Sequence, residues 1–156
     1  MPDIPLDFRE KHLTTDQNDE LWSCRPFVVG EIGFLRPLCL IDTTAPFSIV
    51  SHSVAKHVKW TPLGSRAKID GKSVSLDWQG VPCQLGETEI YLLEQPKGTK
   101  RLGPFILTGK LAQAPHAAFE NHVILGMNFL ADNNIGLTIY GRSSPGLLVG
   151  WLSLPG

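Results

Sequence analysis

The sequence predicts an all-β fold, and three observations support that prediction. From Arg25 onward the apolar segments are short, and Gly or Pro interrupts them at roughly the spacing of strands and turns in a β-barrel or sandwich. The 156 residues include 15 Gly and 12 Pro, enough to supply a turn after each segment. A hydrophobic fraction of 42% and a charged fraction of 19% are typical of one globular core.

The segment that follows Arg25 contains the strand that leads to the candidate site. Apolar and β-branched residues predict strands over 27–32, 34–41 and 47–50, followed by a short helix over 53–59. The second strand runs through the apolar stretch LCLI directly into Asp42. We therefore expect Asp42 at the exit of a buried strand.

The middle of the chain predicts a pair of hairpins. Strands are expected over 73–78 and 83–93, with the turn QGVP between them, and EQPKGTKR forms a loop before a strand over 105–111. Residues 112–121 then cross to a compact apolar strand over 122–125. Gly126 ends that strand.

A short helix and two strands are expected to close the domain. The segment MNFLADNN predicts one or two helical turns, because Met127, Leu130 and Ala131 can share a face and the two Asn residues can stop the helix. Strands over 135–140 and 147–152 flank the turn GRSSPG.

The first 22 residues differ from the rest in composition. They are polar and weakly periodic, so we expect an N-terminal arm over 1–22 and a single domain over 23–156. Such an arm can reach a partner subunit.

Composition excludes several functions and suggests a location. A formal charge of −1 argues against a general nucleic-acid binder. No apolar run approaches the ~18 residues of a membrane span, and the start MPDIPLDFREKH is too polar for a signal peptide, so a cytoplasmic protein is expected. The three Cys residues are far apart and form no CxxC pair, which suggests neither a disulfide framework nor a zinc site.

Asp42 is the residue that most clearly calls for an explanation. Burial of a carboxylate costs several kcal/mol unless it is hydrogen-bonded or shares a proton. Thr43, Thr44, Ala45 and Pro46 follow it and can form a tight loop whose hydroxyls and N–H groups point back at the carboxylate. An Asx turn that merely caps the loop is the alternative.

Two segments together resemble the retropepsin-like aspartic protease family. LCLIDTTAPFSIVS resembles the retropepsin catalytic loop, and VILGMNFL resembles the apolar pair, Gly and short helix near the C-terminus of those proteins. The intervening DWQGVPCQLGETEIYLL is similar to the flap-bearing region of bacterial single-domain members. The resemblance implies a closed β-barrel of the acid protease type, with one short helix after the strand that ends in ILG.

The resemblance also implies an activity. Such a protein is an aspartic endopeptidase that works as a homodimer on a peptide or protein substrate, with Asp42 as the one catalytic carboxylate of each subunit. The two carboxylates share a proton and activate a water molecule for peptide-bond hydrolysis. No metal or other cofactor is implied.

The same resemblance assigns roles to further residues. Thr43 and Thr44 belong to the catalytic loop, where the Thr43 hydroxyl braces the two loops across the dimer axis. The residues expected to contact substrate or to form the flap tip are Ala45, Gln79, Gly80, Val81 and Pro82. The residues expected to support the catalytic loop from beneath are Ile124, Leu125 and Gly126.

Thr44 departs from the family pattern, which has Gly at this position. Two alternatives to the enzyme therefore stay open. One is a catalytically degenerate dimer of the same fold that binds peptide in its groove by strand addition. The other is a structural dimer held by the apolar C-terminal segment GLLVGWLSL.

Overall fold

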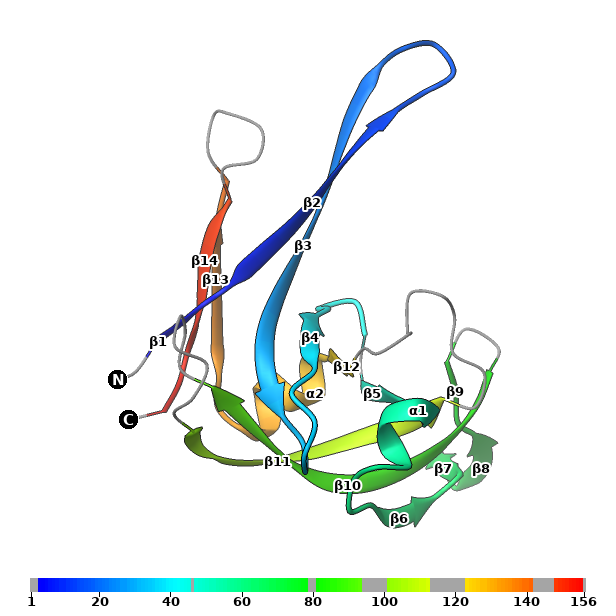
Figure 1. Ribbon diagram of the computed structural model, residues 1–156. Helices are drawn as coiled ribbons and strands as arrows, with labels where there is room; N and C mark the ends of the chain where they lie inside the picture. Colours follow the sequence, from blue (N-terminus) through cyan, green and yellow to red (C-terminus); the bar gives the residue numbers. More distant parts are fainter. Residues whose placement is uncertain are drawn as a thin grey trace.

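The computed structural model describes residues 3–45, 47–78, 81–93, 101–112, 123–141 and 148–155, and it confirms the all-β class (Figure 1). Among these residues, no helix combines the length and the hydropathy that a membrane span requires. The elements in chain order are β1 (Asp3–Pro5), β2 (Asp7–Thr14), β3 (Glu20–Glu31), β4 (Leu38–Ile41), β5 (Ser48–Ser51), α1 (His52–Ala55), β6 (Thr61–Gly64), β7 (Arg66–Ile69), β8 (Lys72–Ser75), β9 (Asp77–Trp78), β10 (Val81–Leu93), β11 (Arg101–Ala112), β12 (Val123–Leu125), α2 (Met127–Asp132), β13 (Gly136–Tyr140) and β14 (Val149–Ser153).

Six strands pair into a closed ring. The order is β3, β4, β12, β5, β11 and β10, and β10 returns to β3 through the pairs Tyr91↔Glu31 and Leu92↔Gly30. The expected closed β-barrel is therefore confirmed, and the short helix after the ILG strand is α2. A separate three-stranded sheet has the order β1-β14-β13.

The strands that lead to Asp42 bury both of their faces. In β4, Cys39 and Ile41 belong to the main core, whereas Leu40 between them belongs to a second, smaller cluster. Because successive side chains of a strand point to opposite faces, the side chains of β5 and β12 are likewise split between the two clusters. The second cluster consists of Leu40, Ala45, Ile49 and Ile124, with Phe27 packed against it.

Strands β4 and β12 are parallel, and this sets the position of the site. Their register pairs Ile41 with Leu125, so both strands end at the same level of the barrel. The loop after β4 and the helix after β12 therefore begin side by side. Residues that lie far apart in the sequence meet here.

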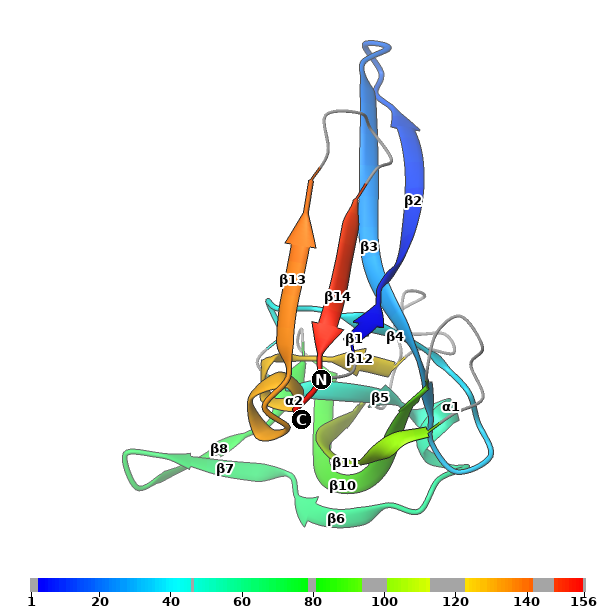
Figure 2. The same ribbon diagram turned by 90° about the vertical axis from the view of Figure 1, so that its left-hand side faces the viewer.

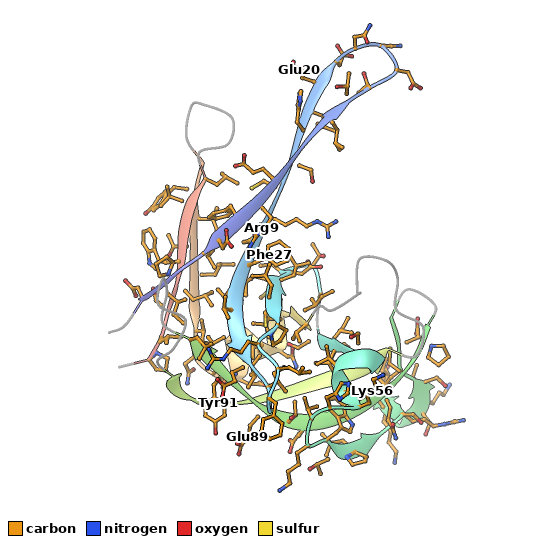
Figure 3. All side chains as sticks on the ribbon, in the orientation of Figure 1. Arg9, Glu20, Phe27, Lys56, Glu89 and Tyr91 are labelled. Atoms are coloured by element: carbon orange, nitrogen blue, oxygen red, sulfur yellow. The ribbon has the colours of Figure 1, made fainter. Side chains whose placement is uncertain are left out.

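The N-terminal segment is a β-hairpin arm rather than an irregular one. Strands β2 and β3 pair continuously from Asp7↔Phe27 to Thr14↔Glu20, and the hairpin extends away from the barrel (Figure 1). Figure 3 shows Phe27 at its base, Arg9 along it and Glu20 near its tip. The boundary expected between residues 22 and 23 falls inside β3, and β1 pairs with β14 in the domain.

Several element boundaries differ from the sequence predictions. The strand expected over 34–41 begins only at Leu38, because Ile32 and Leu35 close a tight turn in which Gly33 has a φ of +58°. The helix expected over 53–59 is the shorter α1. The strand expected over 73–78 is divided into β8 and β9, between which the N–H of Leu76 donates to the carbonyl of Ser65. The crossing segment 113–121 lies outside the described residues.

Candidate functional site

Asp42 lies in the loop that follows β4, half-buried, with its backbone tied to the barrel. Its N–H donates to the carbonyl of Leu125 at 3.1 Å, and its own carbonyl accepts from the N–H of Ala45 at 3.2 Å. The side-chain oxygen Oδ1 accepts from the N–H of Thr44 at 2.9 Å and from its hydroxyl at 2.6 Å. Within the described part of the chain, Oδ2 has no hydrogen-bond partner.

Gly126 supports this loop by a close backbone approach. A Cβ built on Gly126 would lie 2.5 Å from the carbonyl oxygens of both Ala45 and Phe47, a distance that Cβ atoms do not reach. The N–H of Met127 also donates to the carbonyl of Ala45 at 2.8 Å. Helix α2 has no side-chain N-cap, and the loop after β4 supplies an acceptor in its place.

Ser48 and Asn128 connect the far end of the loop to the same helix. The N–H and the hydroxyl of Ser48 donate to Oδ1 of Asn128 at 2.7 and 2.8 Å, while Ser48 Oγ accepts from the N–H of Gly126 at 3.0 Å. Ser48 is fully buried, so these contacts are shielded from water. Sequence reasoning did not assign a role to Ser48, because a single Ser after an aromatic residue has no distinctive local pattern.

Most of the predicted site residues lie together. Asp42, Thr43 and Thr44 form the loop, Ala45 is buried beneath it, and the turn from β12 into α2 supports it. Ile124 faces the second cluster, and Leu125 faces the main core.

Thr43 is exposed and borders an apolar hollow. The hollow has a volume of about 450 Å³ and lies between the loop, α2 and β13. Its lining residues are Thr43, Met127, Leu130, Ala131, Asn134, Ile135 and Leu137. The hydroxyl of Thr43 has no partner among the described residues.

The predicted flap tip cannot be placed in full. Gln79 and Gly80 lie outside the described residues, and the adjoining backbone pairs Val81 with Trp78 and Pro82 with Asp77. A second hairpin, β7–β8, has all eight strand residues exposed. Its turn at Asp70 and Gly71 has φ values of +50° and +79°, as a type I′ turn requires.

Two of the three thiols, those of Cys39 and Cys24, have raised pKa values. Burial raises the pKa of the Cys39 thiol to about 12. Burial, and then the neighbouring Glu10, also raise the pKa of Cys24. Thiols with raised pKa values stay protonated near neutral pH and are poor nucleophiles. Among the described residues, no group of three His, Cys, Asp or Glu side chains is arranged to hold a metal ion.

Three of the solved structures that are similar to this chain cover more than three quarters of its length, each with a TM-score below 0.5. EIAV protease in complex with an inhibitor matches with a TM-score of 0.41 and 17% identity, covering 77% of this chain and 93% of that one. A retropepsin-like aspartic protease from Rickettsia conorii matches with a TM-score of 0.44 and 11% identity over 94% and 93% of the two chains. The retroviral protease-like domain of Ddi1 from Leishmania major has a TM-score of 0.39 and 15% identity over 81% and 93%. No family model and no curated protein matches the sequence.

The contact beneath the loop predicts that Gly126→Ala is strongly destabilising. The new methyl group must displace two backbone carbonyls, so we expect the free energy of unfolding to fall by about 2 to 3 kcal/mol in urea denaturation. Gly136→Ala is the matched control. Its Cβ would meet only Ser153 at 3.5 Å, and a change within about 0.5 kcal/mol is expected. Equal effects of the two substitutions would contradict the assigned role of Gly126.

The polar network predicts energetic coupling between Ser48 and Asn128. Each single change to Ala leaves a buried partner unsatisfied, with an expected loss of about 1 to 3 kcal/mol. The double variant should lose less than the sum, with an interaction energy of about 1 kcal/mol or more by urea denaturation. Ser48→Ala combined with Asn133→Ala is the control, since Asn133 bonds elsewhere, to the carbonyl of Phe129. Additivity in both pairs would show that Ser48 and Asn128 have no coupling energy and would contradict this prediction.

Proposed function

We propose that this chain is an aspartic endopeptidase of the retropepsin type, active as a homodimer with Asp42 as its catalytic residue. The observation that carries the proposal is the state of the Asp42 carboxylate. One oxygen is fixed by two donors of its own loop, and the other has no partner in the described chain. A carboxylate held in this way by backbone contacts to a second strand and a helix is pre-organised to act on a water molecule.

One chain provides only half of the chemistry. Peptide hydrolysis by carboxylates needs an ionised group that takes a proton from water and a protonated group that hydrogen-bonds the scissile carbonyl oxygen. The water oxygen then bonds to the carbonyl carbon, and the resulting tetrahedral intermediate loses the amine after its nitrogen is protonated. A second Asp42, brought by a twofold axis, supplies the other carboxyl group.

The hollow beside Thr43 is the surface that we assign to the second copy. It adjoins the candidate catalytic loop, and its lining is mainly apolar. Strand β13 is an edge of its sheet and exposes Ile139 and Tyr140. An open apolar edge of this kind favours pairing with another chain. A partner docked there would approach Thr43 and Asp42 directly.

The β7–β8 hairpin is the better-supported candidate for the element that covers the substrate. It projects beyond β6 to one side of the barrel (Figure 2). An isolated two-stranded hairpin is only marginally stable in water, so closure over a bound peptide would supply contacts that it lacks. Of the flap tip expected over 79–82, Val81 and Pro82 are strand residues of β10, and Gln79 and Gly80 remain a prediction from the sequence.

The assignment of Asp42 predicts the outcome of a cleavage experiment. Wild-type protein and Asp42→Asn are incubated with a mixed peptide library between about pH 3 and 7, and the products are identified by mass spectrometry. We expect cleavage by the wild type and none by the variant, with the same thermal unfolding midpoint within a few degrees. Retained cleavage would place the chemistry elsewhere. Peptide binding by both proteins without cleavage would favour the non-catalytic alternative.

The proposed dimer surface predicts that Met127→Glu yields a monomer. Met127 is 47% exposed in the hollow, so a carboxylate there should be tolerated by the isolated fold but not by an apolar interface. Sedimentation velocity should show a loss of the dimer, together with a loss of hydrolysis. Leu63→Glu on β6 is the control, because Leu63 is similarly exposed at 49% and lies outside the hollow. A dimer that survives Met127→Glu would refute this surface.

A further inference from the structure

Thr44 gives Asp42 a hydrogen bond that the Gly of the family pattern cannot make. Its backbone N–H and its hydroxyl both donate to the same oxygen, Oδ1, at 2.9 and 2.6 Å. The second distance is in the range of a charge-assisted O–H···O⁻ bond, which is about twice as strong as a neutral one. The side chain therefore adds a direct contact to the proposed catalytic carboxylate.

The loop does not need glycine to adopt its shape. Among the described residues, the non-glycine residues with positive φ are Asn18, Asp70 and Asn134, and Thr44 is not one of them. A β-branched residue thus fits this backbone without left-handed strain. The departure from Gly adds a donor and imposes no forbidden backbone conformation.

The side-chain donor to this carboxylate within the described chain is the hydroxyl of Thr44. The elements packed against the loop present uncharged groups to it, namely Ser48 from β5, Gly126 after β12, and Met127 and Asn128 from α2. The acidic residue of α2, Asp132, ends that helix. In the proposed dimer the remaining charged group is the partner's Asp42.

We propose that Thr44 is a positioning residue of the catalytic centre, whose hydroxyl fixes Oδ1 as an acceptor and leaves Oδ2 to face the water and the second carboxylate. This inference rests on the proposed function and goes beyond it. Two donors on Oδ1 restrict rotation of the carboxyl group, so the two oxygens become distinct.

The expected effect on catalysis follows from that restraint. Without the hydroxyl, the carboxyl group rotates more freely and Oδ2 faces the water less often, so kcat should fall about tenfold while KM changes little.

Three variants separate the hydroxyl from the size and shape of the side chain. Thr44→Val keeps the shape without the donor, Thr44→Ser keeps the donor, and Thr44→Gly restores the family residue. One readout is kcat and KM, measured separately at one pH on a peptide that the wild type cleaves. The other is NMR relaxation of the ¹³C-labelled carboxyl carbon of Asp42 at the same pH, which reports how freely the carboxyl group rotates and needs no activity.

The expected result is that Val and Gly lower kcat and increase the rotation of the Asp42 carboxyl group together, whereas Ser leaves both near the wild-type values. Equal values in all four proteins, equal effects of Ser and Val, or a Gly variant with an unchanged or higher kcat would each overturn the role of Thr44. A wild type without hydrolysis would refute the proposed protease, and the NMR relaxation would still decide whether the hydroxyl restrains Asp42. The failures of the two proposals are thus distinguishable.

Discussion

The contact between Gly126 and the loop that contains Asp42 is the constraint on which the rest of the site depends. The absence of a side chain at Gly126 lets its backbone approach the carbonyl oxygens of Ala45 and Phe47 closely. This approach brings the start of α2 under the loop, where Met127 donates to Ala45. Ser48 and Asn128 then secure the exit of the loop. In the proposed dimer, where Asp42 meets its symmetry mate, this rigidity would matter because a shift of about 1 Å in a catalytic group can reduce the rate severely.

The sequence was sufficient for the parts of this site that are local and strongly patterned. The run LCLI before Asp42 and the run VIL before Gly126 have the apolar character of strands buried on both faces, and β4 and β12 are such strands. The sequence was insufficient where the structure depends on pairing between residues that lie far apart in the chain. Residues 7–14, DFREKHLT, have no apolar face from which a strand could be predicted. They form β2 because they pair with β3. The role of Ser48 likewise depends on Asn128, which is 80 residues away in sequence.

The proposed dimer gives several exposed features of the single chain a common role. Thr43 and Leu137 of β13 line the same apolar hollow, and β13 is an edge of its sheet. In the proposed dimer a symmetric partner would cover the hollow and bring a second carboxyl group to Asp42. The N-terminal β2–β3 hairpin is a separate feature, which pairs continuously along its length and extends away from the barrel (Figure 1).

The most direct test of a site shared between two chains is the activity of mixed dimers. Wild-type and Asp42→Asn chains are co-refolded from denaturant in varied ratios at constant total concentration, and peptide hydrolysis is measured for each mixture. If each centre needs one Asp42 from each chain, activity falls with the square of the wild-type fraction, because mixed dimers are inactive. A linear fall would place a complete site within one chain and would contradict the account, as would the absence of hydrolysis from pure wild-type protein.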